Sequence, residues 1–207
     1  PPRSTLFPYT TLFRSVVDPG PERPAVPAPK DAIVLFDGSS LSQWRAQDSS
    51  SAAKWTVRDG YVEVKAGTGT MVSARPFGDV QLHIEWATPA VAQGEGQERG
   101  NSGVFLMGIY ELQVLDSYQN DTYPDGQAGA IYGQNPPLVN ATRPPGQWQA
   151  YDVVFHRPRF KADGSLERPA RMTVFLNGVL IQDNFELVGP TANRSQPPYK
   201  AHADKLP

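Results

Sequence analysis

Short runs of alternating apolar and polar residues, separated by turn sequences, constrain the fold of this chain more than any other feature. In residues 80–86, His83 and Glu85 fall on the face opposite Leu82 and Ile84, because successive side chains of a strand point to opposite faces. No stretch of useful length has the apolar spacing of a helix. The pattern therefore indicates strands throughout.

Two hairpins can be located from their turns. Asn177-Gly178 separates the apolar runs 174–176 and 179–181, and Asn-Gly is the strongest local signal for a two-residue hairpin turn. A second hairpin is predicted at Arg58-Asp59-Gly60, and residues 151–155 add a further strand. Short strands with regular turns favour an all-β fold, an antiparallel β-sandwich.

The richest segment for function is 101–147, where a predicted strand at 110–114 is followed by a long loop rich in Gly, Pro and Tyr. Alternation sends Leu112 and Val114 into a core and projects Glu111 and Gln113 together from the other, open face. A loop of this length is either functional or disordered, and its aromatic content favours function.

Asp116 follows at an odd offset from Glu111, so a regular strand would place it on the opposite face. A β-bulge near Leu115 would return Asp116 to the face of Glu111 and Gln113. The spacing is similar to the E-x-D-x-x-E signature of laminarinase-type glycosidases, although the second and third residue types differ here.

Composition excludes several classes of function. The chain has 207 residues, 19 basic and 21 acidic side chains, and a net charge of −2. Without a Lys/Arg block, nucleic acid is not an expected partner. The absence of cysteine removes disulfides, thiol nucleophiles and Cys-ligated zinc. No apolar stretch is long enough for a membrane span.

The ends of the chain differ from its middle. Residues 3–15 repeat Thr-Leu-Phe and look foreign to the fold, and residues 18–30 are a Pro-rich linker. We therefore expect residues 1–30 to lie outside the fold and residues 31–207 to form a single domain. A linker of this kind often follows an export signal, so a periplasmic or secreted location is expected.

Several motifs carry a family resemblance that runs from about Ile33 to about Thr191. They include LFDG at 35–38, NSGVFL at 101–106, YELQVLDS at 110–117, TYPDGQAGAIYGQ at 122–134 and PPLVNATRPPGQWQAYDVVF at 136–155. In these the chain resembles the bacterial 3-keto-disaccharide hydrolase family, formerly a domain of unknown function. The resemblance implies a concanavalin A-like jelly roll whose concave face, under the long loop, binds carbohydrate. It also implies a closing strand after Tyr199, so we expect the domain in this chain to be truncated at its C-terminus.

The resemblance implies an enzyme that cleaves 3-keto-glycosides. A base would remove the proton on C2, the enolate would expel the C1 substituent, and water would add to complete net hydrolysis. Glu111 is the expected base, with Asp116 as the second choice and Gln113 as a donor to the sugar. His83 and Glu85, expected in the same sheet, would return a proton or bind a divalent metal ion. No cofactor is certain.

Substrate contacts are expected from two groups of residues beside this strand. Arg99 and Asn101 lie at its mouth, and Tyr118, Tyr123 and Tyr132 lie on the loop, where their rings suit the faces of a sugar. Blander roles stay open: Glu111 and Gln113 as solvated residues, Asp116 in an Asx turn, His83 at the surface, and the tyrosines as anchors of the loop. The alternative function is a non-catalytic carbohydrate-binding module, because jelly rolls also serve as lectins.

Overall fold

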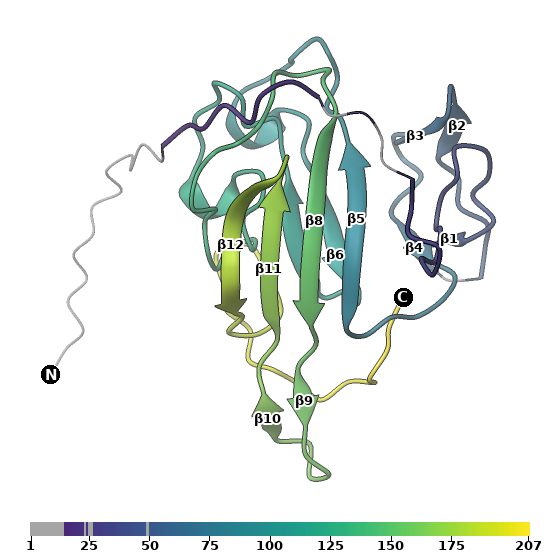
Figure 1. Ribbon diagram of the computed structural model, residues 1–207. Helices are drawn as coiled ribbons and strands as arrows, with labels where there is room; N and C mark the ends of the chain where they lie inside the picture. The colour runs from purple at the N-terminus through teal and green to yellow at the C-terminus, as the bar shows by residue number, and fades with distance from the viewer. Residues whose placement is uncertain (1–14, 23, 25–26, 49) are drawn as a thin grey trace, which may run out of the picture. The chain divides into compact units, whose positions relative to one another are not determined.

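A four-stranded antiparallel sheet with the order β12-β11-β8-β5 dominates the computed structural model (Figure 1). Its strands are β5 (Val80–Trp86), β8 (Gln149–His156), β11 (Arg171–Leu176) and β12 (Val179–Glu186). The structure describes residues 15–22, 24, 27–48 and 50–207. The repeated Thr-Leu-Phe motif lies outside these residues.

A second sheet consists of β6 (Ser102–Leu106) and β7 (Tyr110–Val114), and β6 lies behind the large sheet in Figure 1. The core fills the space between the two sheets. On β7, Tyr110 and Leu112 are fully buried, and the ring of Tyr110 lies 5.6 Å from that of Phe155 on β8. The predicted all-β sandwich is confirmed, as is the burial of Leu112 and Val114.

The Asn177-Gly178 hairpin forms as predicted between β11 and β12. Both turn residues have positive φ, 55° and 83°, which is the conformation that a two-residue turn between twisted strands requires. The remaining short elements of this part are β9 (Arg159–Phe160), β10 (Leu166–Arg168) and the 3₁₀ turns η1 (Gly96–Glu98) and η2 (Pro124–Gly126).

The long loop between β7 and β8 is fixed along the free edge of β7. The backbone N–H of Gln113 donates to Ala130 O (3.0 Å), and that of Tyr132 donates to Glu111 O (3.2 Å). Leu112 and Ile131 form an antiparallel bridge between these bonds. The loop therefore satisfies a strand edge that would otherwise be unpaired, and it places Tyr132 beside Glu111.

The chain divides into two compact units. The larger contains both sheets and comprises residues 79–202 with the described residues up to Glu22. The smaller comprises the described residues of 23–78 with residues 203–207. The expectation of a single domain from residue 31 stays a prediction.

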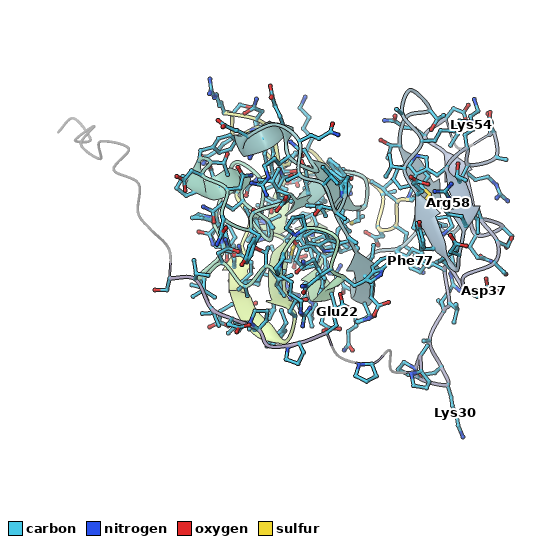
Figure 2. The ribbon with its side chains drawn as sticks, turned by 90° about the horizontal axis from the view of Figure 1, so that it is seen from above. Glu22, Lys30, Asp37, Lys54, Arg58 and Phe77 are labelled. Atoms are coloured by element: carbon cyan, nitrogen blue, oxygen red, sulfur yellow. The ribbon has the colours of Figure 1, made fainter. Side chains whose placement is uncertain are left out.

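The smaller unit holds two short antiparallel pairs. They are β1 (Trp44–Ala46) with β4 (Met71–Ser73), and β2 (Thr56–Arg58) with β3 (Tyr61–Glu63). Figure 2 labels Lys30, Asp37, Lys54, Arg58 and Phe77 of this unit. The hairpin predicted at Arg58-Asp59-Gly60 is confirmed.

Residues 15–22 form hydrogen bonds with the larger unit, although residues 18–30 were predicted to be a linker. Val17 N–H donates to Asn140 O (2.9 Å), and Trp148 N–H donates to a carboxylate oxygen of Glu22 (2.6 Å). The guanidinium of Arg143 donates to the carbonyl oxygens of Gly20 and Pro21, each at 3.1 Å. This segment therefore belongs with the larger unit. Among the described helices, none has the length and apolar content needed to cross a membrane.

Candidate functional site

Glu111 lies on the outer face of the β6–β7 sheet, away from the core. Its neighbours on β7, Tyr110 and Leu112, are fully buried between the sheets, so alternation turns Glu111 the other way. Directly opposite on β6 is Phe105, whose side chain is 46% exposed. On the other edge of β7, Tyr132 pairs with Glu111 through its backbone N–H. An acidic group thus stands between two aromatic residues.

Gly103 leaves the space that the carboxyl group of Glu111 occupies. A Cβ atom on Gly103 would lie 2.3 Å from Oε1 of Glu111, far inside any permitted contact. The side chain of Glu111 therefore extends across β6 over a residue that has no side chain. Sequence reasoning missed Gly103 and Phe105 as site residues, and only the register of the 102–114 hairpin would have revealed them.

Burial raises the pKa of Glu111 from 4.5 to about 7. Loss of solvation is the cause, because it disfavours the charged form of a carboxyl group. A group with such a pKa is present in both protonation states near neutral pH. It can therefore accept a proton and return it, which is the property required of a general acid–base catalyst.

Gln113 shares the outer face with Glu111 but is only 1% exposed. The prediction that it stands on an open surface is wrong, because η1 and η2 cover it. Its Nε2 donates to Gln97 Oε1 (3.1 Å), to Asn101 Oδ1 (3.3 Å) and to Gly126 O (3.3 Å). These protein partners occupy the amide that was expected to contact the sugar.

Asp116 is held by Arg99. Its Oδ2 accepts from Nε (3.0 Å) and Nη2 (2.6 Å) of Arg99, and Oδ1 accepts from the N–H of Tyr118 (3.2 Å). The bond to Tyr118 is the Asx-type contact that was the alternative for Asp116. The pairing of β7 with β6 is regular over Tyr110–Val114 and ends before Leu115, so the bulge near Leu115 stays a prediction.

Arg99 and Asp116 line a pocket of about 260 Å³ together with residues of the 88–100 segment. The other members are Thr88, Pro89, Val91, Ala92, Gln93, Glu98 and Gly100. The side chain of Asp116 is nearly buried beneath Arg99, at 2% exposure against 15%. This pocket can receive a polar group against Arg99. Asn101, next to it, uses its Nδ2 to donate to Gln97 O (2.9 Å).

His83 and Glu85 lie on the other sheet, so the prediction that they share a sheet with Glu111 is wrong. They project from the exposed face of β5, where His83 Nδ1 lies 2.7 Å from Asp152 Oδ1 and Nε2 lies 3.8 Å from Glu85. The structure does not bring these two residues together with Glu111. The sequence separation between His83 and Glu111 did not indicate whether their strands belong to the same sheet.

Two of the three loop tyrosines form a pair. The hydroxyl oxygens of Tyr123 and Tyr132 are 2.8 Å apart, and the ring of Tyr123 packs on Gly126, where a Cβ would meet it at 2.2 Å. Burial raises the pKa of Tyr123, and the bond to Tyr132 adds to this effect. The hydroxyl of Tyr123 is therefore neutral at physiological pH. Tyr118 is set apart, beside Asp116.

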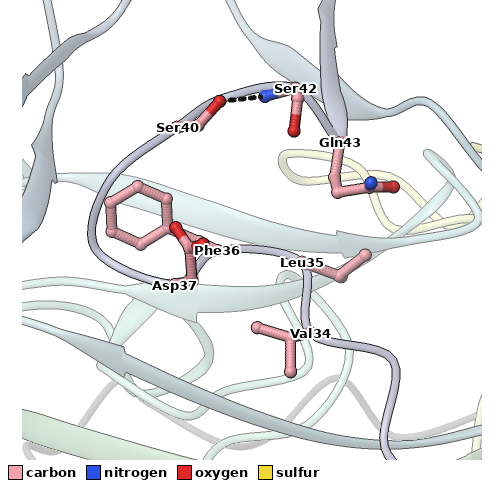
Figure 3. A pocket seen from close by; sticks show the side chains of 7 residues that line it. All are labelled: Val34, Leu35, Phe36, Asp37, Ser40, Ser42 and Gln43. Carbon is pink, nitrogen blue, oxygen red and sulfur yellow. Dashed lines mark hydrogen bonds between the residues drawn. The ribbon is translucent and has the colours of Figure 1, made fainter.

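A separate hollow of about 360 Å³ occurs in the smaller unit, where residues 34–43 curve around it (Figure 3). Its one carboxylate, Asp37, accepts from the N–H and hydroxyl of Ser39, so it is engaged in its own turn. None of the expected site residues lines this hollow. Within the described part of the chain, no group of three or more His, Asp or Glu side chains is placed to hold a metal ion.

The chain matches a family model, the 3-keto-alpha-glucoside-1,2-lyase-like domain, over residues 31–206. The chain belongs to this family. The family predicted from the motifs is confirmed, and the match extends beyond the expected limit at Thr191. No curated protein matches the chain.

Among solved structures, one described as a "putative glycosyl hydrolase" from Parabacteroides distasonis ATCC 8503 is 43% identical, with a TM-score of 0.82. The match covers 89% of this chain and 84% of that one. A second structure of the same description and organism has 22% identity and a TM-score of 0.53, over 74% and 71% of the two chains; it supports the fold alone. The family and the first neighbour support a carbohydrate hydrolase type of function.

Proposed function

We propose that this protein cleaves 3-keto-glycosides by removing the proton on C2, with Glu111 as the base. The observation that carries the proposal is the position of Glu111: a carboxyl group on the outer face of the β6–β7 sheet, over Gly103, with a pKa raised to about 7. Such a carboxylate is a stronger base than a solvated one, while enough of it stays ionised near neutral pH.

The steps balance as follows. The C2 proton passes to the carboxylate of Glu111, and the electron pair of the C–H bond forms an enolate with the C3 ketone. The enolate re-forms the ketone as the C1–oxygen bond breaks, which leaves a C1–C2 double bond and an alkoxide that takes up a proton. Water then adds across the double bond, with its oxygen going to C1. The net reaction is hydrolysis.

A hydrogen-bond donor to the C3 oxygen would stabilise the enolate. The pair Tyr123–Tyr132 suits this role because two hydroxyls joined at 2.8 Å use only one of their two hydrogens for each other. The second hydrogen is available to a ligand. The backbone N–H of Tyr132 donates to the carbonyl oxygen of Glu111. This contact supports placing the hydroxyl donor and the base at one site.

Phe105 supports a sugar as the ligand. A phenylalanine that is 46% exposed and faces a half-buried carboxyl group across a strand pair offers an apolar ring to the C–H face of a pyranose. The pocket at Arg99 lies beyond the other end of the strand pair, past Ser102 and Val114, and offers polar contacts there.

The decisive experiment compares the protein with Glu111→Gln on a 3-keto-disaccharide, and measures free sugar together with deuterium at C2 when the reaction runs in D₂O. We expect turnover with deuterium incorporation in the protein, and loss of turnover by at least about 100-fold in the variant. Glu167→Gln, at an exposed carboxyl on β10, is the matched control.

Two results would contradict the proposal. Undiminished turnover in Glu111→Gln would remove Glu111 from the chemistry, and cleavage without deuterium at C2 would exclude proton abstraction there. Sugar binding without any turnover would instead identify a carbohydrate-binding module. Adding a chelator to the active protein tests separately whether the reaction needs a divalent metal ion.

A further inference from the structure

The carboxamide of Gln113 is surrounded by more oxygen atoms than it has hydrogens to offer. At its nitrogen end lie Gln97 Oε1, Asn101 Oδ1 and Gly126 O, at 3.1, 3.3 and 3.3 Å. At its oxygen end lie Ser102 O at 3.0 Å and Glu111 Oε1 at 3.1 Å. An amide has two N–H hydrogens and one oxygen that only accepts. The oxygen end therefore faces two further acceptors.

Neighbouring amides fix which end is nitrogen. Gln97 Nε2 donates to Gly126 O (2.8 Å) and to Thr122 Oγ1 (2.9 Å), so the oxygen of Gln97 is turned to Gln113. Asn101 Nδ2 donates to Gln97 O (2.9 Å), which likewise turns its Oδ1 to Gln113. Reversing Gln113 would give donors to Glu111 and Ser102 O, but it would set the carboxamide oxygen against three oxygens, those of Gln97, Asn101 and Gly126. The nitrogen of Gln113 accordingly faces Gln97 and Asn101.

With this orientation, the charge state of Glu111 decides whether its contact with Gln113 is favourable. An ionised carboxylate would place two acceptor oxygens 3.1 Å apart beside a buried amide. A neutral carboxyl group would supply the hydrogen that the contact lacks, as an O–H donating to Gln113 Oε1. Burial costs an unpaired acceptor free energy, so the protonated form is favoured.

We propose that Gln113 is a positioning residue that strengthens Glu111 as a proton acceptor, by offering its buried carboxamide oxygen to the protonated carboxyl group. The proposal rests on the proposed function for its catalytic meaning. The proton taken from C2 completes the hydrogen bond that the ionised site lacks, so proton transfer from the substrate becomes more favourable.

The other groups packed against Glu111 do not account for this effect. β6 presents Gly103 and the carbonyl of Ser102, neither of which titrates. The covering loop contributes Tyr132 through its N–H, and Thr191 Oγ1 accepts from the N–H of Glu111 (2.8 Å). The raised pKa of Glu111 has burial as its cause, with no contribution from a charged side chain.

Replacing Gln113 by methionine tests the proposal, because methionine keeps the length of the side chain and removes its oxygen. The carboxyl ¹³C signal of Glu111, assigned by its absence in Glu111→Gln, is titrated by NMR without any substrate. We expect the midpoint to move to lower pH, by about one unit, a tenfold change in the acid constant. The acid limb of the pH–rate profile should move with it, and kcat should fall.

The matched control is Gln182→Met, because Gln182 is also 1% exposed and its amide bonds to Gly129 O (2.9 Å) and Asn135 (2.8 Å), away from Glu111. In Gln182→Met, the titration midpoint of Glu111 should equal the midpoint in the unaltered protein. If Gln113→Met does not fold, Asn101→Ala serves instead. Removing Oδ1 of Asn101 frees Gln113 to turn its nitrogen to Glu111, which should also lower the midpoint.

A midpoint that stays or rises in Gln113→Met would overturn the proposal, because burial alone would then set the proton affinity of Glu111. The NMR result stands whether or not the protein acts on 3-keto-glycosides. A lowered midpoint in a protein without turnover would support the Gln113–Glu111 coupling and contradict the proposed function.

Discussion

Glu111 extends across β6 to the position where a side chain of Gly103 would begin, with 2.3 Å between Oε1 and the missing Cβ. The glycine is not needed for backbone conformation, since its φ is not positive. Its small size serves the neighbouring carboxyl group.

Gly103→Ala is expected to displace the carboxyl group of Glu111 and to lower kcat by at least about tenfold, because a misplaced base loses alignment with C2–H. Stability should change by less than about 1 kcal/mol, since the clashing atom is the end of a flexible side chain. Steady-state kinetics and thermal unfolding measure the two effects. Unchanged kcat would show that Glu111 has room elsewhere and that its position over Gly103 is unimportant.

Local patterns predicted the local structure correctly. The Asn177-Gly178 and Asp59-Gly60 turns, the alternation of Leu112 with Glu111, and the strand predicted at 151–155, which lies within β8, follow from spacing and turn chemistry that act over a few residues. These features depend on sterics that each short segment carries by itself.

Long-range placement was not predictable in the same way. His83 was expected in the same sheet as Glu111, but the order of strands in a sheet depends on the packing of the whole core, and β5 pairs with β8 instead. The burial of Gln113 depends on Gln97 and Gly126, which come from segments 16 and 13 residues away. Nothing in the YELQV pattern distinguishes an open amide from a covered one.

Stability should fall with rising pH between about 4.5 and 7 because of Glu111. The pKa of Glu111 is about 7 in the folded protein against an ordinary 4.5. Between these pH values the folded state binds more protons than the unfolded state, so the free energy of unfolding decreases as the pH rises. Glu111→Gln should remove this dependence and be more stable by about 1 kcal/mol at pH 8, a value reduced for partial exposure.

Urea unfolding at several pH values measures this difference, with Glu167→Gln as the control for an exposed carboxyl group. Curves of stability against pH that run parallel for the protein and Glu111→Gln would show that Glu111 titrates normally.

Phe105→Ala is expected to raise KM by about tenfold with a smaller change in kcat, because stacking on a sugar contributes about 1 kcal/mol or more to binding in both ground and transition states. Phe105→Tyr keeps the ring and should keep KM. The exposed Phe175 on β11, 37% exposed on the other sheet, gives a control in Phe175→Ala. Equal KM for the protein and Phe105→Ala would remove Phe105 from the binding surface.

The tyrosine pair predicts a non-additive result. Tyr123→Phe and Tyr132→Phe should each lower kcat by about tenfold to a hundredfold, because either change breaks the 2.8 Å bond that orients the remaining hydroxyl. The double variant should be little worse than the poorer single variant, since the hydroxyls act as one unit. Multiplied losses in a double-mutant cycle would indicate that the two hydroxyls act independently. Tyr118→Phe controls for a loop tyrosine outside the pair.

Arg143 should hold the segment 15–22 to the larger unit. Its guanidinium is buried at 6% exposure and donates to Gly20 O, Pro21 O and Trp148 O at 3.0–3.1 Å, and also to Asn177 Oδ1. Arg143→Met removes the donor from three part-buried carbonyl oxygens, while Asn177 Oδ1 keeps the N–H of Ala150, so we expect a loss of about 1–3 kcal/mol in the free energy of unfolding. Arg168→Met, at an exposed position on β10, should change it by less than about 0.5 kcal/mol.

Removing residues 1–22 tests the same contact from the other side. If Arg143 and the segment stabilise one another, truncation should lower stability in the unaltered protein and have a smaller effect in Arg143→Met, with a coupling energy of about 1 kcal/mol or more in urea unfolding. The bonds from Arg143 to Gly20 and Pro21 exist only when both partners are present, which is why the two losses cannot add. Strictly additive losses would mean that the segment lies against the unit without contributing to its stability.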